Sequence, residues 1–417
     1  MPTRYNHLPT LHLPTHPDAQ SKAQPLQKQT PTPPALGSIL RDIGGWFFAT
    51  RLVLTAVGLI AHTYLPTDYG KQTSWSPHLW LDLWGVWDSV WYMDIAQNGY
   101  STKALTARFP EQTNFPFFPL YPLLMRVIGW VIGDPYLAGL LISNSCLLVS
   151  AYLLYRLVEA DSNHKTAKRA VKYLFLFPVS FILSGVFTES LFLCLCLLCF
   201  FLARRQRWAL ASLSGMLLSA TRPLGVLIML PLFIEYVQRP RVRSKATQHY
   251  PVKNNPQVFS WESLWLLLIP LGLAGFCLYN YQVTGDLFFF KTNQAAWNRE
   301  FANPMIVVWQ SLKVGIGDPH FKKLLEVSFG CTALIGLCAF RKQIGLAYWV
   351  LGIYSLLIPM SAGIASQPRF TVVVFPLFII LAMLSRHRQW DWGLSAFLGL
   401  LQGGLMVFWC TGYGLVI

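Results

Sequence analysis

The clearest chemical signal in the sequence is a run of acidic and aromatic residues that ends near Gly99, a residue suited to a helix C-terminus. If residues 87–97 form a helix, these side chains share two neighbouring stripes. One stripe holds Trp87, Trp91 and Asp94, and the other holds Asp88, Tyr92 and Ile95. Carboxylates among aromatic rings lose solvation and become more basic, as a general base requires. Asp88 and Asp94 are therefore candidate bases; the alternative is that they only solvate a surface helix.

Four further polar sites interrupt apolar runs in distant parts of the chain. They are Asn114 before Phe-Pro-Phe-Phe-Pro, Glu189 between Thr188 and Ser190, Arg222 before Pro223, and Arg369 after Pro368. A charge within an apolar segment is costly, so each is a candidate functional residue. Two arginines and two carboxylates around one pocket would suit a phosphate leaving group beside a base. Taken singly, each could also be an ordinary residue at a helix end.

The composition indicates which solvent these residues face. Of the 417 residues, 54% are hydrophobic and only 12% are charged, and the mean hydropathy is +0.42. A soluble domain carries roughly 25% charged residues, so the chain is predicted to be an all-α polytopic membrane protein. Disordered, fibrous and disulfide-rich secreted classes are excluded. The eight cysteines lie in apolar runs, where we expect buried small hydrophobic residues rather than metal ligands.

The sequence divides into a tail and a membrane domain. Residues 1–37 contain eight prolines and no apolar periodicity, which predicts a disordered cytoplasmic tail. Residues 38–417 form the membrane domain, with about eleven transmembrane helices predicted from its apolar runs. These runs lie near residues 43–65, 137–157, 172–186, 188–203, 208–221, 223–237, 263–282, 323–340, 344–360, 370–385 and 392–413. Arg51, inside the first run, is expected to snorkel or to pack inward.

The distribution of basic residues sets the predicted topology. With the N-terminus in the cytoplasm and residues 116–132 on the membrane surface, 21 of the 33 Lys and Arg residues are cytoplasmic. This agrees with the positive-inside rule, which explains the formal charge of +15 without nucleic acid. Residues 66–136 then form an extracytoplasmic loop with interfacial helices, on the same side as Glu189, Arg222 and Arg369.

Five segments of the chain resemble, in the same order, the second-mannose transferases of the GPI mannosyltransferase family PIG-V and their prokaryotic relatives. They are WDSVWYMDIAQNGY, NFPFFPLYPLL, TESLF, ATRPLG and, more weakly, PRF. The resemblance implies a GT-C-like glycosyltransferase whose first outer loop holds the catalytic carboxylate. The Trp-Asp pair is the functional mark of that family, which implies catalytic roles for Trp87 and Asp88. Val86 stands where members often have a basic residue, which leaves the sugar and the acceptor open.

The resemblance implies an inverting transfer of a hexose, with mannose expected, from polyprenyl phosphate to a lipid-linked or membrane-delivered acceptor. Asp88 would be the general base. The expected substrate-binding residues are Arg222 and Arg369 for the phosphate, Trp91 and Tyr92 for the sugar, and Asp94, Asn114 and Glu189 as support. The lipid-phosphate sugar is a co-substrate and no cofactor is expected. No cluster demands a metal, although Asp88 and Asp94 could hold one weakly.

The expected partners are the lipid donor, a glycolipid or other membrane acceptor, and the bilayer, with no nucleic acid. The expected location is the prokaryotic plasma membrane, or the ER membrane in a eukaryote. Two alternatives remain open: a transporter or flippase for an amphipathic lipid, and a scaffold subunit with a decayed site. Broken helices in two symmetry-related halves would favour a transporter, and the sequence shows no such symmetry.

Overall fold

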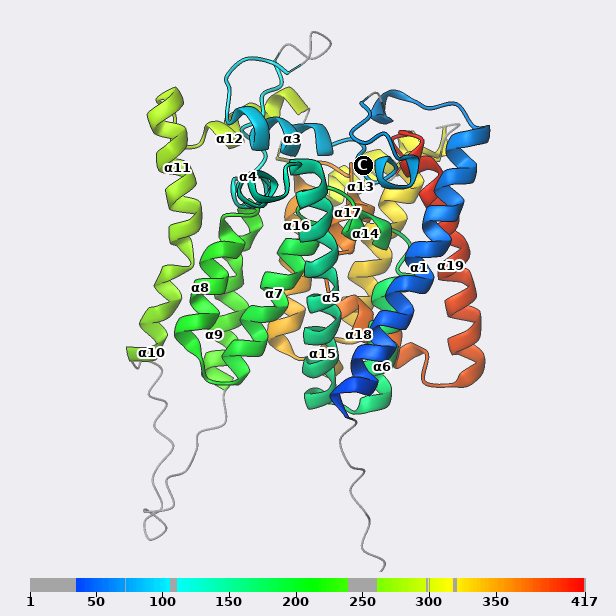
Figure 1. Ribbon diagram of the computed structural model, residues 1–417. Coiled ribbons are helices and arrows are strands. Elements are labelled where there is room, and N and C mark those ends of the chain that lie inside the picture. Colours follow the sequence, from blue (N-terminus) through cyan, green and yellow to red (C-terminus); the bar gives the residue numbers. More distant parts are fainter. Residues whose placement is uncertain are drawn as a thin grey trace, which may run out of the picture. The chain divides into compact units, whose positions relative to one another are not determined.

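The computed structural model describes residues 35–71, 73–105, 111–238, 261–297, 299, 301–317 and 321–415. The described residues form helices and connecting segments and contain no strand, which agrees with the predicted all-α class (Figure 1). Residues 35–417 belong to one compact unit. Most of the predicted tail, residues 1–34, lies outside the described residues, whereas Leu36 and Gly37 already belong to the first helix.

The described chain contains long helices, short helices and 3-10 segments. The longer helices are α1 (Leu36–Tyr64), α3 (Ser89–Asn98), α4 (Leu120–Ile132), α5 (Pro135–Asp161), α6 (His164–Leu176), α7 (Glu189–Arg204), α8 (Trp208–Ser219), α9 (Met229–Gln238), α11 (Pro270–Thr284), α13 (Pro304–Ile316), α14 (Lys322–Ala339), α16 (Leu346–Ser361), α18 (Pro376–Leu384) and α19 (Arg388–Cys410). The short helices are α2 (Leu79–Asp82), α10 (Trp261–Leu264), α12 (Phe289–Thr292), α15 (Arg341–Ile344) and α17 (Gln367–Thr371). The 3-10 helices are Tyr69–Lys71, Ser180–Ser184, Pro223–Ile228, Trp265–Leu268 and Asn293–Trp297.

Several of these helices could cross a membrane. Within the described part of the chain, four helical segments are long and apolar enough: Leu36–Tyr64, Pro135–Asp161, Trp261–Thr284 and Arg388–Cys410. Shorter apolar helices are Leu120–Ile132, Trp208–Ser219, Pro223–Gln238, Pro304–Ile316 and Leu346–Ser361. These helices support the predicted membrane-protein class, while the number of eleven spans stays a prediction.

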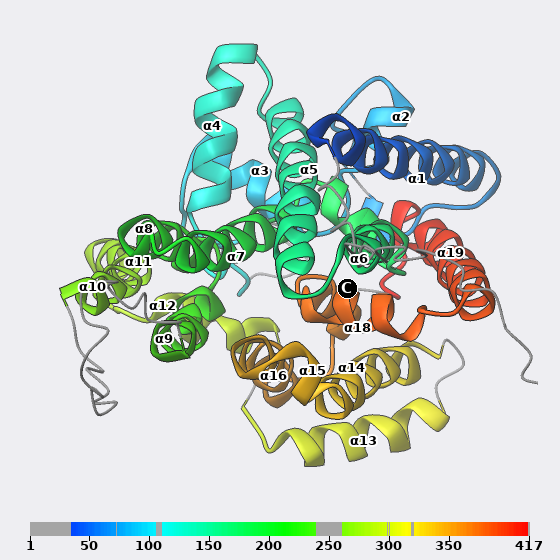
Figure 2. The same ribbon diagram turned by 90° about the horizontal axis from the view of Figure 1, so that it is seen from below.

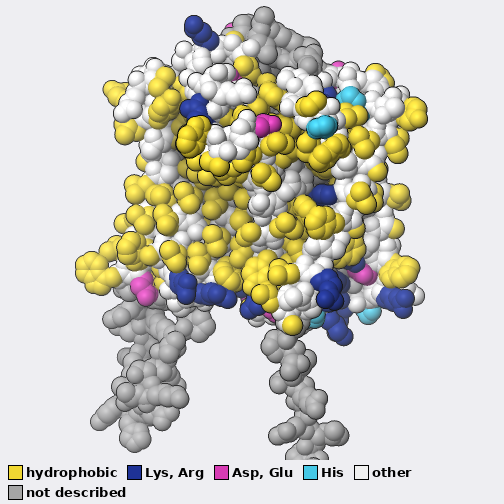
Figure 3. Space-filling model, viewed as in Figure 1, with side chains coloured by type: hydrophobic (Ala, Val, Ile, Leu, Met, Phe, Trp, Pro, Cys, Tyr) yellow, Lys and Arg dark blue, Asp and Glu magenta, His cyan; other side chains and the backbone are white. Residues whose placement is uncertain are grey.

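The helices have two main orientations. In Figure 1, α1, α5, α11 and α19 run in roughly the same direction, whereas α4 is seen end-on and lies across them; Figure 2 shows α4 lengthwise. The placement of residues 116–132 on the membrane surface stays a prediction. Hydrophobic side chains cover the middle of the face in Figure 3, and Lys and Arg side chains gather along its lower rim. An apolar belt bounded by basic side chains is typical of membrane proteins.

The predicted span 172–186 is wrong as a continuous helix. Helix α6 ends at Leu176, and the chain continues as the 3-10 helix Ser180–Ser184. Pro178 explains the break, because the residue before a proline avoids the helical conformation. Phe177 accordingly has φ −59° and ψ 136°. The interrupted segment leads directly to Glu189, the first residue of α7.

Two polar side chains stabilise this break. Arg51 packs inward from α1: its Nε donates to Ser184 Oγ at 2.8 Å and its Nη2 to the carbonyl of Ser180 at 2.7 Å. From α19, Gln402 Nε2 donates to the carbonyl of Phe175 at 2.8 Å and to that of Phe177 at 3.0 Å. Because buried carbonyls without partners are costly, these bonds make a non-helical segment tolerable inside the protein.

The predicted span 370–385 is also wrong as a continuous helix. Helix α17 ends at Thr371, and α18 begins only at Pro376 and has nine residues. Proline has no N–H to donate and favours the first turn of a helix, so a new helix starts there. Because the helix is interrupted, α17 is a separate short helix. It carries Arg369 close to the N-terminus of α3.

The predicted orientation can be tested with reporters of membrane side. A reporter fused after Ser244, which is outside the described residues, should give a cytoplasmic signal, because this segment is strongly basic. A reporter after Thr73 should give an extracytoplasmic signal. Alkaline phosphatase and green fluorescent protein fusions report the two sides. The same signal from both positions would contradict the topology.

Candidate functional site

The segment that precedes α3 differs from the predicted helix over residues 87–97. The helix begins at Ser89, and Trp87 has φ 50° in the left-handed region. Trp87 therefore does not share a helical stripe with Trp91 and Asp94, which corrects that expectation. The predicted C-terminus is confirmed, since Gly99 has φ 87° and its N–H donates to the carbonyl of Ile95. Asp88 lies at the start of the helix but its side chain makes no capping hydrogen bond.

Two hydrogen bonds attach α3 to the chain between the α6 break and α7. Ser89 Oγ donates to the carbonyl of Val186 at 3.2 Å. Tyr92 Oη and Thr188 Oγ1 share a hydrogen bond of 3.2 Å, and both residues are buried. These bonds bring the N-terminus of α3 beside the N-terminus of α7, so that Asp88 and Glu189 lie in one region.

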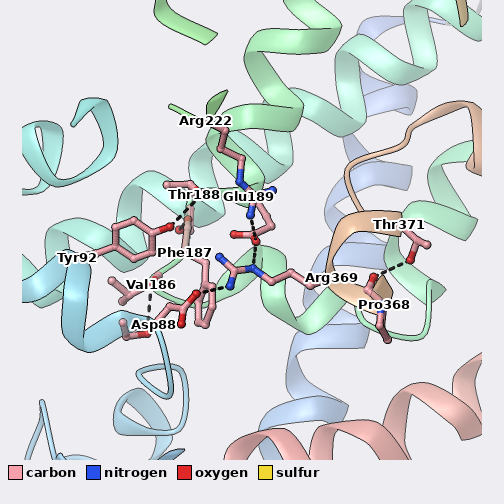
Figure 4. A network of polar contacts seen from close by, with 12 residues as sticks. Asp88, Tyr92, Val186, Phe187, Thr188, Glu189, Arg222, Pro368, Arg369 and Thr371 are labelled. Carbon is pink, nitrogen blue, oxygen red and sulfur yellow. Dashed lines mark hydrogen bonds and ion pairs between the residues drawn. The ribbon is translucent and has the colours of Figure 1, made fainter. Parts of the chain in front are cut away.

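Asp88, Glu189, Arg222 and Arg369 form a continuous charged cluster (Figure 4). The guanidinium of Arg369 pairs with Asp88 through Nη1 and with Glu189 through Nε. Arg222 Nη2 lies 2.6 Å from Oε1 of Glu189. The structure therefore brings together four residues that are distant in the sequence; their role in binding or catalysis stays a prediction.

The two carboxylates of this charged cluster differ in how far they are buried. The Glu189 side chain is fully buried, whereas that of Asp88 keeps 15% of its surface exposed. Burial alone would lower the pKa of Arg369, but the charges of Glu189 and Asp88 raise it above its usual value. Arg369 thus stays a cation that neutralises the buried Glu189 and orients the accessible Asp88. Its guanidinium also lies 4.9 Å from the ring centre of Phe187.

The ring of Trp87 packs against glycines of two other segments. A Cβ on Gly70 would lie 2.2 Å from Cε2 of Trp87, and a Cβ on Gly414 would lie 3.2 Å from its ring. The Trp87 N–H donates to the carbonyl of Gly70 at 2.8 Å. Trp87 therefore anchors the chain just before Asp88, so its contacts favour a positioning role.

The remaining predicted residues have contacts of their own. Trp91 is buried with its ring stacked on Phe117, at 5.5 Å between centroids. Asp94 accepts hydrogen bonds from Asn98 at 2.9 Å and from Asn114 at 2.7 Å. Asn114 also donates to the carbonyl of Gly99 and so holds the loop after α3. These contacts place Asp94 and Asn114 in a loop-holding network, separate from the four-residue charged cluster.

Arg299 is a site residue that the sequence did not reveal. Its guanidinium carbon lies 5.8 Å from the ring centre of Phe370, and that of Arg222 lies 5.7 Å from the same ring. Phe370 directly follows Arg369 in the chain. Arg299 belongs to a polar stretch without a recognisable motif, so only the fold brings it to the charged cluster.

Within the described part of the chain, no three His, Cys, Asp or Glu side chains come together as a metal site. Arg369 occupies the position between Asp88 and Glu189 that a bridging cation would need. Asp94, the other carboxylate proposed for a weak metal site, instead binds two asparagines.

Two solved structures of the oligosaccharyltransferase of Archaeoglobus fulgidus are weakly similar to this chain. The complex with Zn and sulfate is 12% identical, with 87% of this chain and 53% of that chain covered and a TM-score of 0.39. The form tethered by a disulfide to an acceptor peptide with the NVT sequon is 10% identical, with 88% and 55% covered and a TM-score of 0.41. This chain spans about half the length of those chains.

Neither a family model nor a curated protein matches the sequence. The resemblance to the PIG-V family therefore stays a prediction that rests on the segments quoted above.

Proposed function

We propose that the protein is a GT-C-type membrane glycosyltransferase that moves a hexose, with mannose expected, from polyprenyl phosphate to a membrane acceptor. The observation that supports this most is the state of Asp88. Its Oδ2 pairs with Arg369, while its Oδ1 has no hydrogen-bond partner among the described residues. A carboxylate that is held by one oxygen and partly exposed is suited to accept a proton at the other.

The proposed step is a single displacement at the anomeric carbon. The acceptor hydroxyl oxygen forms a bond to this carbon from the face opposite the phosphate, which inverts its configuration. The bond between the anomeric carbon and the phosphate oxygen breaks, and its electron pair leaves on the lipid phosphate. The hydroxyl proton passes to Oδ1 of Asp88. Because lipid phosphate is a good leaving group, one base together with nearby positive charge is sufficient.

The roles of the other residues follow from their contacts. Arg369 orients Asp88, and Glu189 holds Arg369 and Arg222 together. Tyr92 is only 3% exposed and Trp91 only 7%, so a sugar could contact them only after a local rearrangement. The Trp-Asp pair and the four segments that follow it, which resemble the PIG-V family, support mannose as the expected sugar.

The proposal is tested by incubating purified full-length protein with radiolabelled polyprenyl-phosphate mannose and total membrane lipid. We expect label to appear in a new lipid or membrane-bound product, with release of unlabelled polyprenyl phosphate. A matched reaction with the Asp88→Asn protein serves as the control. If label crosses the membrane of proteoliposomes but stays on polyprenyl phosphate, the protein is a flippase and the proposal is wrong.

A further inference from the structure

The two arginines expected to bind the donor phosphate are already engaged by carboxylates. Arg369 pairs with both Asp88 and Glu189, and Arg222 pairs with Glu189 at 2.6 Å. A phosphate that bound either guanidinium would have to share its positive charge with a carboxylate that is already paired to it. Neither arginine therefore offers its whole charge to a further anion.

Arg299 is a third guanidinium in the same place. Arg299 follows the 3-10 helix Asn293–Trp297, and its backbone N–H donates to the carbonyl of Gln294 at 3.4 Å. Arg299 and Arg222 both approach the ring of Phe370, at 5.8 and 5.7 Å from its centre. Because Phe370 follows Arg369 directly, three guanidinium groups converge around one short segment, α17.

Arg299 lacks the ion pairs that the other two arginines make. Arg222 and Arg369 pair with Glu189 or Asp88, whereas no carboxylate among the described residues forms an ion pair with Arg299. Burial lowers the pKa of Arg299, and the charges of Arg369 and Arg222 lower it further, while Asp88 and Glu326 offset only part of this effect. In Arg369, by contrast, paired carboxylates raise the pKa. Arg299 is therefore a partly buried cation that feels the charges of Asp88 and Glu326 but is paired with neither, close to the carboxylate proposed as the base.

We infer that Arg299 binds the phosphate of the lipid-linked donor, and that Arg222 and Arg369 instead hold the carboxylates in place. The inference rests on the proposed function and names the residue that recognises its donor. The ligand class is a phosphate ester carried on a polyprenyl chain. A guanidinium presents a planar fork of N–H groups that matches phosphate oxygens, and the ring of Phe370 supports it from the side.

Binding of farnesyl phosphate, a short polyprenyl monophosphate, tests the inference without a transfer reaction. Radiolabelled farnesyl phosphate is titrated onto full-length protein in detergent. We expect Arg299→Gln to raise its dissociation constant about ten- to a hundredfold, as loss of a charge-assisted hydrogen bond predicts. Arg299→Lys should give an intermediate value, because Lys keeps the charge but loses the fork. Farnesol, which has no phosphate, should bind all variants equally.

Arg205→Gln is the matched control. Arg205 is exposed and also lies over a phenylalanine ring, 4.1 Å from the centre of Phe201, but it follows α7 at the end opposite Glu189. Its loss should leave farnesyl phosphate binding unchanged. Thermal denaturation midpoints equal to that of the wild type would show that each variant is folded. We expect this result for the Arg299 variants because Arg299 lies outside the helices.

Three outcomes separate the inference from its alternatives. Wild-type affinity in Arg299→Gln would overturn it. Equal competition by phosphatidylglycerol or by inorganic phosphate would overturn the assignment to the donor and indicate a general anion site. Weakened farnesyl phosphate binding in Arg299→Gln, in a protein that transfers no sugar, would contradict the proposed function but support Arg299 as the ligand of a lipid phosphate.

Discussion

Asp88→Asn should reduce sugar transfer about 100-fold or more, because general-base catalysis contributes roughly this much. Asparagine has nearly the same shape as aspartate, and its amide oxygen can still accept a hydrogen bond from Arg369. It cannot accept the proton of the acceptor hydroxyl. We therefore expect normal expression and membrane insertion together with a large loss of turnover in the radiolabel assay.

Asp94→Asn is the matched control for this variant. Asp94 lies on the same helix, α3, but its carboxylate binds Asn98 and Asn114 rather than an arginine. We expect this change to reduce turnover far less than Asp88→Asn. Turnover near the wild-type value in Asp88→Asn would contradict the assignment of the base and would move it to Asp94 or Glu189.

The sequence was sufficient to find the charged residues but not their pairing. Asp88, Glu189, Arg222 and Arg369 each stand out because charge is rare in apolar segments. The distribution of basic residues predicts that they share one side of the membrane. Which carboxylate binds which arginine depends on distances between helix ends that no local pattern encodes. The sequence therefore predicts that Arg222 and Arg369 bind phosphate, whereas the structure pairs both of them with carboxylates.

Arg299, unlike the four residues of the charged cluster, could not be identified from the sequence. No apolar run flanks it, so nothing marked it as a costly charge. Its significance arises only from the ring of Phe370, which lies about seventy positions further along the chain and is shared with Arg222. Such an arginine is recognised only in the folded protein, from the side chains that surround its guanidinium.

The broken spans show why apolar runs overestimate helices. Residues 172–186 are apolar enough to suggest a span, but Pro178 ends the helix and the 3-10 segment follows. Arg51 and Gln402 bind the carbonyls and hydroxyls of this region. Hydropathy alone contains no information about such partners. Glu189 follows shortly after this break in the chain. The break, which hydropathy does not reveal, therefore helps to position a residue of the charged cluster.

Arg369→Met should destabilise the protein strongly, since it removes the only cation that contacts both carboxylates of the charged cluster in the described chain. Removing one partner of a buried ion pair costs about 3–5 kcal/mol, because the other charge stays buried. Glu189 is fully buried and would keep only Arg222. We expect a clear fall in the thermal denaturation midpoint of the purified protein. Arg341→Met, an exposed arginine 4.5 Å from the ring centre of Trp349, should cause little change.

Two further variants distinguish charge compensation from simple loss of packing. Arg369→Lys keeps a cation, but a compact ammonium cannot reproduce the fixed spacing of the two guanidinium nitrogens that contact the two carboxylates, so its midpoint should be intermediate. Combining Arg369→Met with Glu189→Gln removes the buried charge together with its partner. Because residues in contact are energetically coupled, the double variant should be more stable than the sum of the single effects predicts. Additive effects would mean that Arg369 stabilises the protein through its packing on Phe187 rather than through Glu189.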